Sequence, residues 1–337
     1  MDLVRRMEDA DRDEPSAKTL RERVLDALRT AVPFDGHVFA LVDPATLVGT
    51  SPHADVPMLP WERLPETIRC RYLTVLNRVD AVAGHPAASL RTATRNPADS
   101  LLWDRVLREV GVHDTAMITF ADRHGVWGYL ELWRTESEFS AVELRSLTAI
   151  AAPVTAALRG ALARTFAEAD ADGDRPGPAV VVLSDDLVVQ QQTEAAGQAL
   201  LQLLPPDEPM APIPAAAYNV AAALIAAEAG VPLGEPWSRV HLGGNRWVTL
   251  RASRLGTDIA VSIEPPTPAE RMDLYSRAHG LSERETEVVG LLGIGLDTKE
   301  IAGQLFLSEH TVNDHVKAVL AKTGTRTRQV LLARISG

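Results

Sequence analysis

Residues 281–324 read LSERETEVVGLLGIGLDTKEIAGQLFLSEHTVNDHVKAVLAKTG, and this stretch decides the fold of the C-terminal part of the chain. Ser-Glu-Arg-Glu at 282–285 and Asp-Thr-Lys-Glu at 297–300 are capping boxes, in which two side chains satisfy backbone N–H groups at a helix start. Ser308 is a further N-cap residue, because its hydroxyl can accept from an N–H of the first turn. The stretch therefore predicts three helices, and residues 327–335 predict a fourth.

The third of these helices carries one apolar stripe. Its apolar residues are spaced i, i+4, i+7 and i+8 and so share one face: Val312, Val316, Val319 and Leu320. Two short helices joined by a short turn, with polar residues on the outer side of the second, can present that second helix to the major groove of DNA. The alternative is a structural helical bundle whose basic residues form a solvated face.

The same stretch resembles the LuxR-type (GerE-type) four-helix DNA-binding domain, almost without a gap. The matching residues are 281–285, 287–288, 299–302, 305–308, 311–312, 315–316 and 322–324, together with Gly295. The resemblance implies that the third helix reads base edges of double-stranded DNA, while residues around it contact phosphates. The candidate DNA-binding residues that follow are Lys299, Ser308, Thr311, Asn313, Asp314, His315, Lys317, Lys322, Arg326 and Arg328.

The third helix departs from the family at its base-reading position. Members commonly have Lys after the Thr-Val pair, whereas this chain has Asn313 and then Asp314. Asn can pair with adenine, and Asp can accept from the amino group of cytosine or repel a phosphate. Lys317 keeps a positive charge one turn later. Three further positions stand where the family contacts the DNA backbone or braces the helix: Thr311, His315 and Lys322.

The charge of the chain is unevenly distributed. The whole chain has a net charge of −11, but from Arg277 onward eight Lys and Arg face seven Asp and Glu, about +1. The remainder therefore carries about −12. A small cationic patch on an acidic body can still dock on phosphates, because a Debye length of about 8 Å screens the distant charges.

Two polar breaks divide the rest of the chain. Residues 170–178 read DADGDRPGP and residues 264–268 read EPPTP, which are linker-like sequences. Before the first break, the pattern predicts helices at 17–32 and 140–169 and strands at 37–42, 115–121 and 126–133. Between the breaks, it predicts strands at 179–183, 187–191, 237–242, 246–255 and 257–263, with helices at 193–204 and 215–229.

The region before the first break resembles a GAF domain, and the region between the breaks is similar to a PAS domain. The GAF resemblance rests on 33–37 (PFDGH), 125–133 (GVWGYLELW) and 139–144; the PAS resemblance rests on 180–186 and Arg246-Trp247. Both families are α+β sensory modules whose sheet can hold a small molecule in a helix-lined cavity.

The expected fold is thus α+β sensory domains (GAF-like and PAS-like) followed by an all-α four-helix helix-turn-helix domain. The expected division is a polar tail at 1–16, a GAF-like domain at 17–169, a linker at 170–177, a PAS-like domain at 178–265, a linker at 266–277 and the helix-turn-helix domain at 278–337.

Several classes of protein are not expected. No receiver-type phosphoacceptor site, phosphate loop, nucleophile–base pair or metal-ligand spacing is visible, so we expect no enzyme, no metal and no cofactor beyond an unknown small-molecule effector. The single Cys70 excludes an internal disulfide framework and a Cys-rich metal site. The apolar run 148–158 is too short for a bilayer, and residues 1–14 lack an apolar core, so we expect a cytoplasmic protein without a membrane partner.

Two features stay open in the sequence. Cys70 can be a thiol sensor, a bilin attachment point or a plain buried residue. A short heptad stripe either forms a dimer contact or packs on its own sheet, because Pro153 interrupts it; its residues are Leu144, Leu147, Ala151, Val154, Leu158 and Ala161.

The sequence therefore predicts a dimeric, cytoplasmic transcription regulator whose partners are double-stranded DNA, a second copy of the chain and RNA polymerase. Its sensory domains either bind a small molecule or persist as ligand-free dimer scaffolds. A light sensor with a bound chromophore, and an adaptor or enzyme with a C-terminal protein-interaction module, are the competing hypotheses. The DNA sequence, the sign of regulation and the effector are not encoded in readable motifs.

Overall fold

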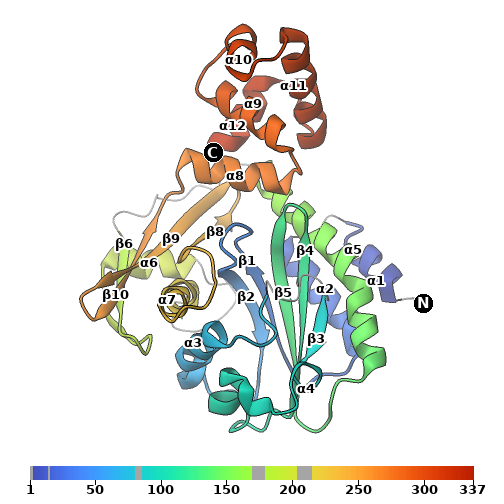
Figure 1. Cartoon of the computed structure of the whole chain (residues 1–337), viewed down its shortest axis with the longest axis vertical. Coiled ribbons are helices and arrows are strands. Elements are labelled where there is room, and N and C mark those ends of the chain that lie inside the picture. The colour runs from blue at the N-terminus through green and yellow to red at the C-terminus, as the bar shows by residue number, and fades with distance from the viewer. Residues whose placement is uncertain (1–2, 14–15, 80–85, 169–178, 203–214) are drawn as a thin grey trace. The chain divides into compact units, whose positions relative to one another are not determined.

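A computed structural model describes the chain at residues 3–13, 16–79, 86–168, 179–202 and 215–337 (Figure 1). The described residues form two compact units. The N-terminal unit contains both sheets and comprises residues 1–158, 174–242 and 247–265. The C-terminal unit comprises residues 159–173, 243–246 and 266–337.

The first sheet is antiparallel, with strand order β2-β1-β5-β4-β3. Its strands are β1 Gly36–Val42, β2 Gly49–Asp55, β3 Ala87–Ser89, β4 Asp114–Asp122 and β5 Gly125–Arg134. The helices of this region are α1 Leu3–Ala10, α2 Ala17–Arg29, α3 Leu64–Leu73, α4 Leu90–Ala93 and α5 Ala141–Thr165. The predicted strands at 37–42, 115–121 and 126–133 are confirmed. α1 lies in the segment expected to be a polar tail, and β2, β3, α3 and α4 were not predicted.

The start of α5 shows how local sequence sets an element boundary. The predicted capping box is present: Ser140 N–H donates to the Glu143 carboxylate at 2.8 Å, and Glu143 N–H donates to the Ser140 hydroxyl at 3.3 Å. The Arg134 ion pair, despite partial burial of the carboxyl, lowers the pKa of Glu143 to about 2. The capping carboxylate is therefore ionised at neutral pH. The predicted end of this helix at residue 169 lies outside the described residues.

The two faces of the first sheet have different partners. Leu158 of α5 lies 3.6 Å from the position that a Cβ on Gly128 would take, so α5 packs closely on β5. On the other face, Trp133 of β5 packs in one core with Cys70 of α3. Burial raises the pKa of the Cys70 thiol, which is 4% exposed, so the thiol is a poor nucleophile at neutral pH.

Most of the heptad stripe on α5 lies in the N-terminal unit and is buried there. Leu147, Val154 and Leu158 are at most 3% exposed, because they cover the first sheet. The interpretation of this stripe as a dimer contact is therefore wrong, and the alternative of packing on its own sheet is confirmed. Among the described residues, α5 is also the one helix that is long and apolar enough to span a membrane. A buried helix that covers a sheet meets the same criterion of length and composition.

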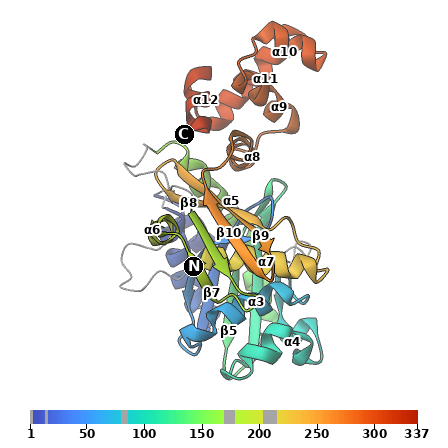
Figure 2. The same cartoon turned by 90° about the vertical axis from the view of Figure 1, so that its left-hand side faces the viewer.

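The second sheet is also antiparallel, with order β7-β6-β10-β9-β8. Its strands are β6 Ala179–Leu183, β7 Val189–Gln192, β8 Trp237–Gly243, β9 Arg246–Leu255 and β10 Asp258–Glu264, and its helices are α6 Glu194–Gln202 and α7 Ala215–Glu228. The predicted order of elements is confirmed. β7 begins two residues later than predicted, because Leu187 closes the preceding turn with a left-handed φ of 59°. In Figure 2, which is turned by 90° from Figure 1, the strands of this sheet lie toward the viewer.

A buried ion pair joins the two sheets within the N-terminal unit. Arg239 of β8 donates to both carboxylate oxygens of Asp43, at 2.7 and 2.8 Å, and the two side chains are at most 1% exposed. Beside it, the Thr46 hydroxyl donates to the carbonyl of Trp237 at 2.6 Å. A Cβ on Gly234 would lie 2.8 Å from the Thr46 backbone, so only glycine permits this close approach. Buried polar contacts and a close backbone approach thus join the two sheets.

His37 in β1 makes the N-terminal unit sensitive to acid. The side chain is buried, and neither ring nitrogen has a hydrogen-bond partner among the described residues. Burial, with a smaller effect of the neighbouring His53, lowers its pKa from 6.5 to about 4. The unfolded chain therefore binds a proton at a higher pH than the folded one. The contribution of neutral His37 to the free energy of unfolding is therefore fully present above pH 6.5, and it is lost as the pH falls towards 4.

We expect the free energy of unfolding to fall by up to about 3 kcal/mol over that interval because of His37. Chemical unfolding followed at a series of pH values measures it. His37→Leu should remove this part of the pH dependence, whereas His113→Asn, at a residue whose side chain is 41% exposed, should keep it. An unchanged profile in His37→Leu would contradict the assignment.

Candidate nucleic-acid interface

Residues 266–337 of the C-terminal unit, here called the C-terminal domain, form five helices. They are α8 Pro268–Ala278, α9 Glu283–Gly293, α10 Thr298–Leu305, α11 Glu309–Thr323 and α12 Arg328–Ser336. The four helices predicted from 281–335 are confirmed. The segment expected to be a linker at 266–277 is largely helical, because Thr267 and Glu270 form a further capping box with Pro268 in the first turn.

The caps that the sequence predicted are formed. The Ser282 hydroxyl accepts from Glu285 N–H at 3.3 Å, and an Asp297 carboxylate oxygen accepts from Glu300 N–H at 2.8 Å. Ser308 accepts from Thr311 N–H at 3.1 Å. These bonds fix where α9, α10 and α11 begin, so the geometry of the helix-turn-helix follows from local sequence.

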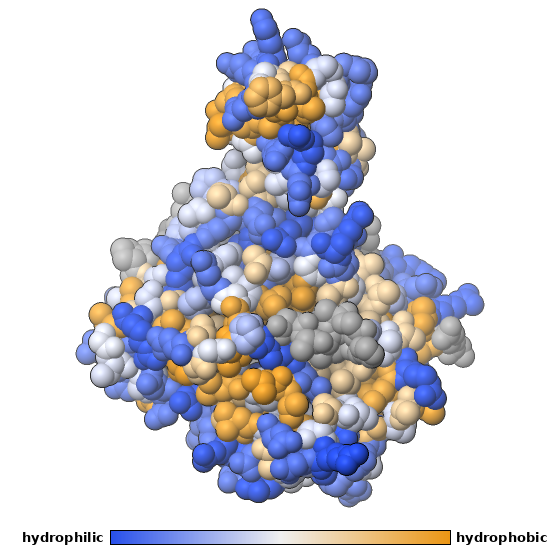
Figure 3. Space-filling model, viewed as in Figure 1, coloured by the Kyte–Doolittle hydropathy of each residue, from blue (hydrophilic) through white to orange (hydrophobic). Residues whose placement is uncertain are grey.

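A short turn of three residues connects α10 to α11. Phe306 ends α10 in the left-handed region with a φ of 55°, and it is 95% exposed. Ile294, just after α9, is 72% exposed. Figure 3 shows an apolar patch on this domain. Contiguous exposed apolar patches can mark contact surfaces, and thymine methyl groups are apolar targets in the major groove.

α11 has a buried side and a polar side. Val312, Val316 and Val319 are at most 4% exposed, and Val312 and Val316 pack in one core with residues of α9 and α10. On the polar side, Asp314 lies 3.4 Å from the Lys317 ammonium and 3.4 Å from the ring Nε2 of His310. The negative charge of Asp314 is thus offset locally. His310 was not among the predicted site residues, although its place in the first turn of α11 is the signal that points to it.

Asn313 is held by a residue from the next helix. Arg328 of α12 donates to the Asn313 side-chain oxygen at 2.9 Å and to the Thr298 hydroxyl at 3.1 Å. Arg328 therefore ties α10, α11 and α12 together. A bidentate contact of Asn313 with adenine would use both the side-chain oxygen and the side-chain NH2 group, so the bond from Arg328 would have to open. The NH2 group alone can donate to a purine N7 without breaking that bond.

Lys322 braces the domain. Its ammonium lies 2.6 Å from the Glu285 carboxylate, which is 7% exposed, and 3.3 Å from the carbonyl of Gly280. Although burial opposes ionisation, the hydrogen bonds from Lys322 and Ser282 lower the pKa of Glu285. The bracing role that the family resemblance offered for Lys322 agrees with this geometry.

We expect Lys322→Met to lower the free energy of unfolding of the C-terminal domain by about 2 kcal/mol, because it leaves the Glu285 carboxylate buried and unpaired. Thermal unfolding measures the change. Lys317→Met removes the same charge at a side chain that is 73% exposed and should cost less than about 0.5 kcal/mol. An equal loss in the free energy of unfolding for the two variants would show that Lys322 does not stabilise the domain through Glu285.

The remaining predicted residues divide into exposed cations and partly buried groups. Lys299 at the start of α10, Lys317 on α11 and Arg326 in the turn before α12 are exposed. The Ser308 and Thr311 hydroxyls lie 2.8 Å apart and share a hydrogen bond, and His315 is half-buried. No group of three or more His, Cys, Asp or Glu side chains with metal-binding geometry occurs among the described residues.

Comparisons with known proteins concern this domain. Residues 279–334 match the family described as bacterial regulatory proteins, luxR family. The segment is 48% identical over 48 residues to the transcriptional regulatory protein LnrK of Bacillus subtilis (14% of this chain, 22% of that protein). It is 43% identical over 60 residues to the DNA-binding transcriptional activator DevR/DosR of Mycobacterium tuberculosis (18% and 26%).

The spore germination protein GerE of Bacillus subtilis is 46% identical over 48 residues, 14% of this chain and 65% of GerE. The chain spans about a quarter of the length of the first two relatives. The C-terminal domain is therefore a LuxR-family domain of the kind found in bacterial regulatory proteins, as the sequence resemblance implied.

Proposed function

We propose that the chain is a transcription regulator that binds double-stranded DNA through its C-terminal domain. The observation that carries the proposal is α11: a helix capped by Ser308, fixed to α10 by a three-residue turn, with its polar side free of the domain core and with a LuxR-family match over 279–334. The relatives' printed descriptions as transcriptional regulators point the same way.

In this proposal α11 enters the major groove, and its first two turns meet the base edges. His310, Asn313 and Asp314 are the base-reading candidates. Lys299, Lys317 and Arg326 contact phosphates, since they are exposed and cationic, while Ser308, Thr311 and His315 support the groove contacts. Lys322 and Arg328 hold the helices in place, because the Glu285, Asn313 and Thr298 side chains occupy their cationic groups.

The N-terminal unit is proposed to sense a small molecule and to control access of the C-terminal domain to DNA. The support is its pair of helix-covered antiparallel sheets, an arrangement that can enclose a small ligand. We further propose that the regulator acts in the cytoplasm as a homodimer on two half-sites about one DNA turn apart, and that it contacts RNA polymerase. In the alternative, the two sheets bind no effector and serve only as a scaffold for the dimer.

Selection of bound duplexes from a random pool, using the full chain, tests the proposal. We expect an enriched motif with two related half-sites, and two chains per duplex in analytical ultracentrifugation. Affinity should fall steeply with salt, because phosphate contacts release counterions. A pool without enrichment, together with salt-independent retention, would overturn the DNA-binding role, and one chain per duplex would overturn the dimer.

A further inference from the structure

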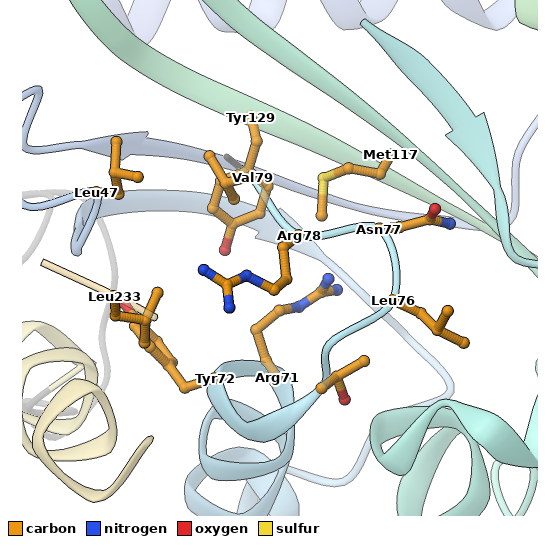
Figure 4. A pocket seen from close by; sticks show the side chains of 11 residues that line it. Leu47, Arg71, Tyr72, Leu76, Asn77, Arg78, Val79, Met117, Tyr129 and Leu233 are labelled. Atoms are coloured by element: carbon orange, nitrogen blue, oxygen red, sulfur yellow. The ribbon is translucent and has the colours of Figure 1, made fainter. Parts of the chain in front are cut away.

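A cavity of about 50 Å³ lies beside α3 in the N-terminal unit (Figure 4). Figure 4 shows the side chains of Arg71 and Arg78 extending toward it. Both guanidinium groups have partners within the chain, since Arg71 pairs with Glu131 and Arg78 donates to the carbonyl of Pro232. The charged side chains on the outer side of α11, by contrast, are all more than half exposed. α11 therefore offers charged groups to another molecule.

The outer side of α11 follows from its buried side. The buried residues of this helix are Val312, Val316, Val319 and Thr323. Two residues turn an α-helix by about 200°, so the residue two positions before each buried one faces away from the domain core. The residues at those four places are His310, Asp314, Lys317 and Ala321, and all of them are exposed. Asp314 lies in the second turn of α11, within the part of the helix that is proposed to meet the base edges.

Asn313 is less available to a base than Asp314. Its side chain is half-buried, and its side-chain oxygen accepts from Arg328 at 2.9 Å. Asn313 is also turned by about 100° around the helix from Asp314. Asp314, whose side chain is 53% exposed, is therefore better placed to meet a base edge.

The Asp314 carboxylate has a basic side chain on each side of it along the helix. Its Oδ1 lies 3.4 Å from the Lys317 ammonium, and its Oδ2 lies 3.4 Å from Nε2 of His310. Both distances exceed the roughly 2.7–2.9 Å of a close charge-assisted hydrogen bond. A carboxylate can accept about four hydrogen bonds, so these two contacts leave capacity for a further donor. The lysine also offsets the negative charge, which reduces its repulsion by phosphates.

A carboxylate in the major groove distinguishes bases by the donors on their edges. It can only accept hydrogen bonds, and the donors in this groove are the amino groups of cytosine N4 and adenine N6. Adenine has the N7 acceptor beside its amino group, and that nitrogen repels a carboxylate. Guanine and thymine present acceptors and, for thymine, a methyl group. Cytosine is therefore the base whose edge best suits Asp314.

We propose that Asp314 determines base specificity in this chain by accepting a hydrogen bond from the N4 amino group of a cytosine in each half-site. The inference deepens the proposed DNA-binding function and rests on it. Lys317 and His310 flank the carboxylate and limit its movement, while Asn313 keeps its bond to Arg328. A negative charge among phosphates also weakens binding to DNA of any sequence, so Asp314 favours specificity over affinity.

Asp314→Asn tests the proposal, because it keeps the size of the side chain and gives it a donor. Asparagine pairs with N6 and N7 of adenine. Selection of bound duplexes by the full chain should give cytosine at one position of each half-site, and Asp314→Asn should select adenine at that position. Replacing that C·G pair by A·T should weaken binding of the unsubstituted chain about tenfold in fluorescence anisotropy. The same replacement should strengthen binding of Asp314→Asn.

Glu309→Gln is the matched control. Glu309 is exposed in the first turn of α11, about 140° around the helix from Asp314, and the substitution removes the same charge. Both variants should bind a random duplex about twofold more tightly, because one negative charge near the phosphates is removed. Only Asp314→Asn should change the selected base. Thermal unfolding should show the same midpoint for both variants and the unsubstituted chain, since both side chains are exposed.

A cytosine preference that persists in Asp314→Asn would overturn the inference. So would a selected motif with another base at the position where Asp314→Asn differs, or an equal change of motif in Glu309→Gln. These results would leave the DNA-binding function intact. An unsubstituted chain that enriches no duplex would contradict the DNA-binding function itself, so the two failures are distinguishable.

Discussion

Asp43→Ala is expected to lower the free energy of unfolding of the N-terminal unit by about 3–5 kcal/mol. The substitution leaves the Arg239 guanidinium buried without its carboxylate, and a lone charge in the interior costs far more than the pair contributes. Asp43 also accepts from the backbone N–H of Ala45 and of Arg239, at 2.9 Å each, so the turn after β1 loses its anchor too. Urea unfolding followed by tryptophan fluorescence measures the loss.

Asp185 offers a matched control for Asp43. It pairs with Arg254 in the same unit, but its side chain is 59% exposed, so Asp185→Ala should cost less than about 1 kcal/mol. The double variant Asp43→Leu with Arg239→Met should recover the part of the loss that the unpaired guanidinium causes, because an apolar pair needs no counter-charge. Similar costs for Asp43→Ala and Asp185→Ala would mean that the joint between the sheets does not depend on the ion pair.

The combined substitution Lys299→Gln, Lys317→Gln and Arg326→Gln is expected to weaken binding of the selected duplex about a hundredfold near physiological salt. Each phosphate contact contributes about 0.9 to the slope of log K against log salt, so the slope should shrink by nearly three. Lys322 stays unchanged, since its loss would disturb the domain through Glu285. Fluorescence anisotropy at several salt concentrations measures both quantities.

The control for this variant has the same net charge. Arg123, Arg145 and Arg284 are exposed and lie outside α10, α11 and the turn before α12, so changing all three to Gln should leave the salt slope nearly intact. An equal loss of affinity in the control would show that only the overall charge matters. No loss in either variant would place the docking face elsewhere on the domain.

The C-terminal helices could be predicted because their signals are local. The capping pairs Ser282 with Glu285 and Asp297 with Glu300 lie three residues apart, and the stripe of Val312, Val316 and Val319 repeats with the helix period. These interactions join residues that are close in sequence, so they can be predicted without knowledge of the tertiary structure. The strand pattern of β4 and β5 was readable for the same reason, since a glycine turn joins two runs of strand-forming residues.

The unpredicted elements lacked such signals. β2 is an edge strand with Pro52 in it, a residue that central strands exclude and edge strands tolerate, and its outer half is polar. α3 begins with proline at its second position and has little periodicity, because it is covered by both the first sheet and α7. Where a helix is buried on two sides, the contrast between a polar and an apolar face disappears.

The sequence by itself determined the C-terminal helices, their caps and the family of the domain. Only the tertiary structure decided which charged residues pair: Asp43 with Arg239 across 196 positions, Glu131 with Arg71, and Glu285 with Lys322. The tertiary structure also showed that the apolar stripe of α5, a candidate dimer contact, packs on the first sheet. The physical reason is range, because caps and periodicity act within a few residues, whereas a buried charge finds its partner only when the folded chain excludes water from both.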